Sequence, residues 1–67
     1  MKQQQLKESF TLTVYRLDGD HAIKLRETGL TVDRESAWRA LLMVREGLPG
    51  DCGASLTDSR GNSVRHP

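Results

Sequence analysis

The sequence has little of what catalytic, metal-binding or disulfide-linked sites require. Cys52 is the single cysteine, so no disulfide can form within one chain. Cys52, His21, His66 and scattered aspartates lack the paired spacing of zinc ligands. Neither histidine stands in a pattern that would activate Cys52 as a nucleophile. We therefore expect no enzyme activity, no metal and no cofactor. The lone cysteine favours a reducing, cytoplasmic compartment.

Long apolar runs and an excess of one charge are also absent. No stretch approaches the roughly 20 apolar residues that span a bilayer, and the polar segment 1–5 leads into no hydrophobic stretch, as a secretory signal would. Ten basic residues stand against nine acidic ones, whereas strong polyanion binders usually show a clear basic excess. The composition predicts no membrane association, and any nucleic-acid binding would need a local basic patch.

The chain is short enough that its own core is small. Its 67 residues predict a single domain, 1–67, in which residues 1–8 form a flexible tail. A domain of this size buries only about 60% of its unfolded surface. With disulfides and metals set aside, oligomerisation remains as a route to extra stability, so a homodimer is one expected partner arrangement.

Alternating apolar residues predict a first β-hairpin. Phe10, Leu12 and Val14 alternate with polar positions along Phe10–Leu17, the period of a strand with one buried face. The segment 18–20 reads Asp-Gly-Asp, which is typical of a tight turn. Together with His21 it is interpreted as a solvated turn, because a calcium loop needs a longer pattern. Ala22–Glu27 forms the returning strand, and the pair 28–29 (Thr-Gly) ends it.

A helix is predicted from Arg34 to Glu46, because both of its ends carry signals. Asp33 is a strong N-cap residue. Gly47 can adopt the left-handed conformation that often follows a helix, and Pro49 prevents the helix from continuing.

A second hairpin is expected after the helix. Ala54–Thr57 reads as a short strand, 58–62 as a hairpin loop with Gly61 in the left-handed conformation, and Ser63–Arg65 as the return strand. The predicted fold class is α+β. It is a small antiparallel sheet in β-β-α-β-β order with one amphipathic helix packed on one face.

The apolar arc of the helix is wider than packing on a sheet requires. Ala37, Leu41, Val44 and Leu48 form the stripe expected to face the sheet. That stripe should meet the sheet residues Phe10, Leu12, Val14, Ile23 and Leu25. Trp38 and Leu42 widen the arc. Either the second hairpin or the N-terminal tail covers these two, or they contact a protein partner, since tryptophan is enriched at interface hot spots.

The outer face of the sheet offers an alternative site. If Phe10 and Val14 face the helix, Tyr15 lies outward beside Lys24 and Arg26. An aromatic ring among basic side chains is how several single-stranded nucleic-acid binders stack bases. The same residues would equally form an ordinary solvated strand surface.

The layout Phe10–Leu17, Ala22–Glu27, Asp33–Glu46 and Ala54–Arg65 resembles the compact strand-strand-helix-strand proteins encoded by bacteriophages and other mobile elements, including some anti-CRISPR proteins. The resemblance is one of size and architecture and carries no functional residue across. It implies a stoichiometric binder or inhibitor.

The favoured interpretation is a non-enzymatic protein-binding module, a small phage-type regulator or inhibitor that covers a partner's surface. Surplus apolar surface and two open sheet edges support it. The candidate contact residues are Trp38, Leu42, Met43 and Arg45. The alternative is a nucleic-acid-binding domain that uses Tyr15, Lys24 and Arg26.

Overall fold

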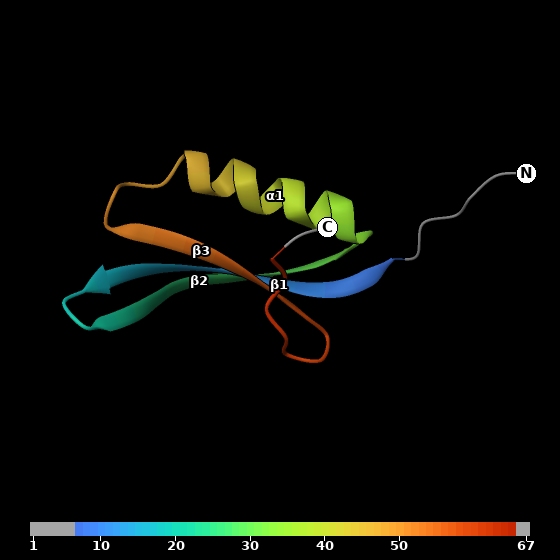
Figure 1. Cartoon of the computed structure of the whole chain (residues 1–67), viewed down its shortest axis with the longest axis horizontal. Helices are drawn as coiled ribbons and strands as arrows, with labels where there is room; N and C mark the ends of the chain where they lie inside the picture. The colour runs from blue at the N-terminus through green and yellow to red at the C-terminus, as the bar shows by residue number, and fades with distance from the viewer. Residues whose placement is uncertain (1–6, 66–67) are drawn as a thin grey trace, which may run out of the picture.

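A computed structural model describes residues 7–65, which form a three-stranded antiparallel sheet with one helix on one face (Figure 1). The elements follow the order β1 (Glu8–Asp18), β2 (His21–Val32), α1 (Arg34–Glu46) and β3 (Cys52–Asp58). The strand order across the sheet is β2-β1-β3, so the first strand is central. The α+β class and the single helix are confirmed, and the order along the chain is β-β-α-β.

The expected fourth strand is not present within residues 7–65. The chain turns back after Asp58 with Gly61 at φ 83°, as predicted, but it then forms a single bridge between Thr57 and Ser63. Val64 next donates its N–H to the carbonyl of Leu56 and turns its side chain into the core. The pairing with β3 is limited to this one bridge and does not extend into a strand.

The first hairpin is longer than the sequence pattern indicates. The pair 28–29, expected to end the strand, lies inside β2, which continues to Val32. The cause is β1, which begins at Glu8 and so offers pairing partners for this segment; Glu8 itself stands opposite Val32. Most of the tail expected over residues 1–8 therefore falls outside the described residues, and its last residue is part of the sheet.

A β-bulge interrupts β2 and was not expected from the sequence. Val14 pairs with Arg26 and Tyr15 with Lys24, which leaves Leu25 unmatched. An extra residue of this kind changes which side chains face a given side of the sheet. Leu25, expected beneath the helix, lies in the bulge and is 53% exposed. Ile23 stands opposite Arg16 and so stays on the side of the sheet that Val14 faces, but at 38% exposed it is not covered as expected.

The helix has the predicted bounds, and its N-cap is confirmed. The Asp33 carboxylate accepts hydrogen bonds from the Ser36 backbone N–H at 3.0 Å and the Ser36 hydroxyl at 2.7 Å. The C-terminal prediction was wrong in detail, because Gly47 has φ −91° rather than a left-handed value. Its N–H instead bonds to the carbonyl of Val44 at 3.1 Å, which tightens the last turn.

The core lies between α1 and the central part of the sheet. Ala37 and Leu41 of the helix are fully buried, and Leu56 of β3 is almost so. The buried cluster comprises Phe10, Leu12, Ala37, Leu41, Ala54, Leu56 and Val64. A buried cluster of this size agrees with the small core expected for a chain of this length.

Candidate functional site

The helix does not cover the whole face of the sheet. It lies mainly on β3, because the small side chain of Ala54 there allows a close approach to Ala37 and Leu41 in the shared core. On the opposite side an open groove of about 490 Å³ remains between α1 and β2. Its lining residues are Leu12, Val14, Arg26, Thr28, Leu30, Ala40, Val44 and Leu48. The groove is an apolar surface that residues 7–65 leave open.

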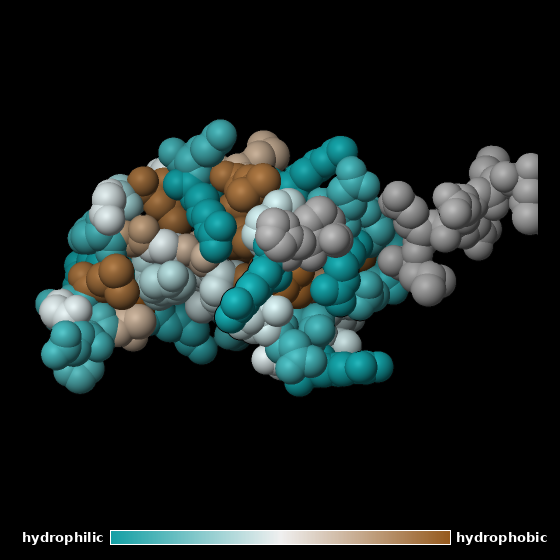
Figure 2. All heavy atoms as spheres, in the orientation of Figure 1, coloured by the Kyte–Doolittle hydropathy of each residue, from teal (hydrophilic) through white to brown (hydrophobic). Residues whose placement is uncertain are grey.

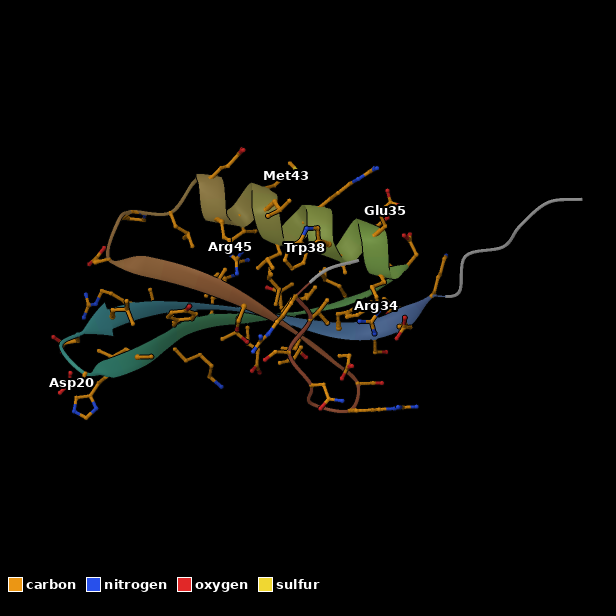
Figure 3. All side chains as sticks on the ribbon, viewed as in Figure 1. Asp20, Arg34, Glu35, Trp38, Met43 and Arg45 are labelled. Carbon is orange, nitrogen blue, oxygen red and sulfur yellow. The ribbon has the colours of Figure 1, made fainter. Side chains whose placement is uncertain are left out.

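On the other flank of the helix, Arg45 binds the sheet. Its Nε and Nη2 atoms donate to the carbonyl oxygen of Ala54 at 3.3 and 3.2 Å, and its guanidinium lies 6.0 Å from the ring centre of Trp38. Trp38 is half-buried and packs against the core. In Figure 3, Arg45 points from α1 toward β3. Two of the four predicted contact residues therefore join the helix to the sheet.

The other two predicted contact residues remain on the surface. Leu42 is 42% exposed and Met43 is 73% exposed, and Met43 points away from the sheet (Figure 3). Figure 2 shows apolar surface over the C-terminal half of α1. The structure thus divides the predicted set: Trp38 and Arg45 hold the helix, whereas Leu42 and Met43 are available to solvent.

The outer edge of β3 is already occupied. The carbonyl of Leu56 accepts from the Val64 N–H at 2.8 Å, and the N–H of Asp58 donates to the Asn62 carbonyl at 2.9 Å. Arg45 binds the carbonyl of Ala54 further along. Backbone groups along this edge therefore have partners, and a further strand would have to displace them.

The outer edge of β2 is open, and the same bonds define which of its backbone groups are exposed there. The carbonyl of Leu56 points away from β1, because it accepts from Val64. Leu12, which is opposite Leu56, therefore points its N–H and C=O groups toward β2. Thr28, which is opposite Leu12, points its own toward β1. Backbone groups alternate along a strand, so Glu27, Gly29 and Thr31 present theirs outward. No bond to these outward groups is found among residues 7–65. An unpaired strand edge thus runs beside the apolar groove.

The residues suggested for nucleic-acid binding do not share one surface. Tyr15 and Lys24 are directly opposite on the outer face, but Arg26 is opposite Val14 and lines the groove on the helix side. Tyr15 is also occupied: a Cβ added at Gly53 would lie 2.7 Å from the Tyr15 hydroxyl oxygen, so the ring covers the Gly53 backbone. The bulge at Leu25 is what separates Arg26 from the other two.

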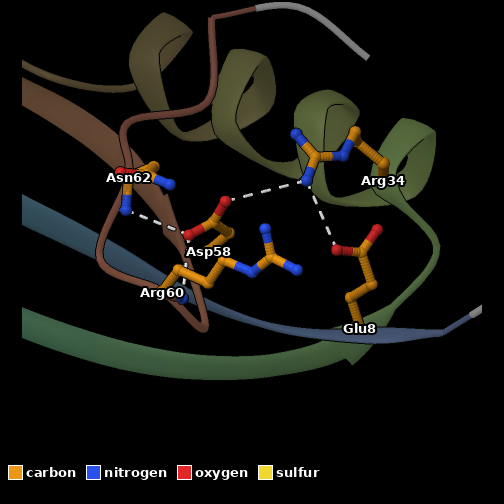
Figure 4. A network of polar contacts seen from close by, with 5 residues as sticks. All are labelled: Glu8, Arg34, Asp58, Arg60 and Asn62. Atoms are coloured by element: carbon orange, nitrogen blue, oxygen red, sulfur yellow. Dashed lines mark hydrogen bonds and ion pairs between the residues drawn. The ribbon is translucent and has the colours of Figure 1, made fainter.

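A polar network joins the start of α1 to the ends of two strands (Figure 4). Arg34 contacts Glu8 at 3.3 Å and Asp58 at 3.8 Å, with its guanidinium 5.5 Å from the ring centre of Phe10. Hydrogen bonds from the backbone N–H groups of Asn62 and Arg60 lower the pKa of Asp58, as does the nearby charge of Arg34. Every member of this network is explained by the fold, so it suggests no chemistry.

Cys52 stands opposite Arg16 at the start of β3. His21 is opposite Asp18 near the same end of the sheet, but it belongs to β2, and the central strand β1 lies between the two residues. Burial raises the pKa of the Cys52 thiol, and so do the charge and hydrogen bond of Asp51, which makes the thiol a poorer nucleophile at neutral pH. Across residues 7–65 there is no group of three or more potential metal ligands. His66 lies outside the described residues.

Comparison with protein-family models, with curated proteins and with solved structures finds no match. In the described part of the chain, α1 is too short and too polar to cross a membrane.

Sequence reasoning missed the groove and the open edge. Leu30 was placed in a connection between strand and helix, and Val44 was assigned wholly to the core. A signal was present, since Leu30 and Val32 alternate with polar residues at the period of a strand. This alternation is out of phase with Ile23 and Leu25, because the bulge at Leu25 inserts one residue. The glycine at position 29 concealed the signal.

Proposed function

We propose that the chain is a non-enzymatic protein-binding module that acts in the cytoplasm through the open edge of β2 and the groove beside it. The single observation that supports this most is their adjacency. Glu27, Gly29 and Thr31 present backbone groups outward, and Leu30 of the same strand lines the groove. A partner segment can therefore meet hydrogen-bonding groups and apolar surface together.

This arrangement matches a known way of recognising a protein. In strand addition, main-chain hydrogen bonds give affinity and pockets for alternate side chains give specificity. The groove volume of about 490 Å³ is in the range of sites that accept apolar groups. A small regulator or inhibitor of the phage type would use such a face to cover a surface of its target.

The proposed surface differs from the contact set inferred from the helix alone. Trp38 and Arg45 are engaged with the core and with Ala54, so their substitution would change the fold as well as binding. Leu42 and Met43 are exposed but lie outside the groove lining. We assign them to the surrounding surface rather than to the main contact.

The test is affinity capture by a tagged chain from a lysate of bacteria that also produce the untagged chain, with and without nuclease, followed by mass spectrometry. The informative variant is Thr31→Pro, which removes an outward N–H where an edge strand tolerates proline. Met43→Asp is the control, because it changes an exposed side chain away from β2. The proposal expects a captured protein that survives nuclease, is retained by Met43→Asp and is lost with Thr31→Pro. The opposite pattern in the two variants would contradict it.

The same experiment addresses nucleic-acid binding. Nucleic-acid binding would be favoured instead if the captured proteins disappear after nuclease treatment. They should also be absent when a Tyr15→Ala, Lys24→Ala double variant is used without nuclease. Binding of this kind falls steeply with added salt, since phosphate contacts release counterions.

A further inference from the structure

We propose that the partner of the β2 edge is a second copy of this chain, bound by antiparallel β2–β2 pairing about a twofold axis at Gly29. This rests on the proposed function, because it concerns the same surface and names its occupant. The two three-stranded sheets would join into one of six strands.

Only one half of β2 is suited to pairing. Natural edge strands are protected by bulges and by charged side chains, lysine above all. The first half of β2 has both, with the bulge at Leu25 between Lys24 and Arg26. The segment 27–32 contains a single charged residue, Glu27, and no proline. The unprotected half is also the one that borders the groove, through Thr28 and Leu30.

The register follows from the charges and the bulge. When two copies of one strand pair antiparallel about a twofold axis, one residue lies on the axis and stands opposite its own equivalent. Residues at equal distances on either side of it are then opposite each other and face the same side of the sheet. An axis at Glu27 would oppose two like charges, and one at Thr28 would draw the bulge at Leu25 into the ladder. An axis at Leu30 would place Glu27 opposite Asp33. At Gly29 the regular segment 26–32 pairs throughout, and the bulge stays just outside it.

In this register the backbone groups of the two copies are complementary. Glu27 stands opposite the second copy's Thr31, and Gly29 opposite its equivalent. All of these residues present N–H and C=O groups outward, so about six hydrogen bonds form. On the helix side, the second copy's Leu30 lies beside Thr28 and continues the apolar wall of the groove.

Gly29 itself supports an approach by another chain. A Cβ added there would meet no atom within 4 Å, and the positive-φ glycines are Gly19 and Gly61. Neither crowding nor backbone conformation within the chain therefore requires glycine at this position. Glycine inside a strand weakens it and often marks a place where another backbone comes close, which is the role that the twofold axis gives to Gly29.

The first test is the mass of the full chain in solution, by sedimentation equilibrium over a concentration series, with amide hydrogen exchange. The dimer should have twice the chain mass. It should also protect the amides of Glu27, Gly29 and Thr31, which face solvent in a monomer, in addition to those of Thr28 and Leu30. Thr31→Pro should raise the dimer dissociation constant at least tenfold while protection of Thr28 and Leu30 persists.

The register is tested by oxidative cross-linking in a Cys52→Ser background. Gly29→Cys places two thiols on Cα atoms about 5.5 Å apart, within the range of a disulfide, so a covalent dimer should form. In Thr31→Cys the two added thiols would be separated by about 13 Å along the paired strands, and no such dimer should form.

A wild-type chain that stays monomeric at millimolar concentration would overturn the inference. So would a dimer whose amides at 27, 29 and 31 exchange fast, since it would use another surface. If Thr31→Pro fails to fold, the inference is tested by the amide exchange of the wild-type chain and by the cross-linking of Gly29→Cys and Thr31→Cys. A monomer that still captures a different protein through Thr31 would retain the proposed function and reject the second copy.

Discussion

The ring of Tyr15 lies across the backbone of Gly53 on the neighbouring strand. A Cβ added at Gly53 would be 2.7 Å from the Tyr15 hydroxyl oxygen and 2.8 Å from the ring carbon that bears it. The two residues are directly opposite in the β1–β3 pairing. A glycine in a strand leaves backbone uncovered, and an aromatic residue on the adjacent strand can cover it.

A side chain at position 53 should therefore displace this ring. We expect Gly53→Val to lower the free energy of unfolding by about 1 to 3 kcal/mol, as overpacking substitutions do. The measurement is urea denaturation. Gly50→Ala, where a Cβ would meet nothing, is the control and should stay within about 0.5 kcal/mol. Equal stability of Gly53→Val and the parent chain would show that the ring is free to move.

The bond between Arg45 and Ala54 should contribute measurably to stability. Arg45→Ala leaves a part-buried carbonyl without its donor and should cost about 1 to 3 kcal/mol in thermal or urea unfolding. The matched control is Arg39→Ala, because the Arg39–Glu35 pair at 2.8 Å is largely exposed and such pairs contribute about 0.5 kcal/mol. Similar losses in both variants would argue against a special role for Arg45.

Trp38 and Leu42 should respond differently to substitution. Trp38→Ala removes a ring that packs against the core and should cost about 2 kcal/mol or more. Leu42→Asp changes a side chain that is 42% exposed and should leave the chain folded, with a smaller loss. Circular dichroism during thermal unfolding distinguishes the two. Unfolding of Leu42→Asp at room temperature would mean that Leu42 belongs to the core.

Stability should fall on the acid side because two carboxyl groups have lowered pKa values. Hydrogen bonds from the Ser36 hydroxyl and N–H lower the pKa of Asp33, and those from Asn62 and Arg60 lower that of Asp58. Each contribution is fully present above the unfolded value, near 3.8, and is lost as the pH falls through the lower folded value.

The measurement is the urea midpoint between pH 7 and pH 2. The contribution of these two groups to the midpoint should stay constant down to about pH 4 and should decline at lower pH. An Asp33→Asn, Asp58→Asn double variant should decline less, since asparagine still accepts hydrogen bonds but does not titrate. Asp20→Asn, in the exposed hairpin turn (Figure 3), should decline like the parent chain. An unchanged decline in the double variant would exclude the two carboxylates as its cause.

The parts of the fold that local signals control were predictable from sequence. Asp33 and Pro49 bracket the helix, and Asp18–Gly19 marks the first turn, because capping and turn preferences act within a few residues. The end of β2 was not predictable in this way. Gly29 reads locally as a break, yet pairing with the early part of β1 outweighs its low strand preference.

The candidate site was less accessible to sequence reasoning, because it depends on where the helix lies across the sheet. A helical wheel shows that Trp38 and Ala40 are on opposite sides of the stripe formed by Ala37, Leu41, Val44 and Leu48, but not which side meets β3. The bulge at Leu25 moved Arg26 from the outer face to the groove, and period-2 counting contains no signal for an inserted residue.

The central position of β1 has a consequence for how the chain acquires its structure. Its pairing with β2 is local and can form as soon as the turn at Gly19 closes. Its pairing with β3 joins Phe10 to Asp58, nearly the whole described length, so it must await a much larger loop closure. Contacts this distant in sequence slow folding. We therefore expect the hairpin to form early and the docking of β3 beneath α1 to limit the rate, so that core substitutions at Leu56 chiefly affect a late step.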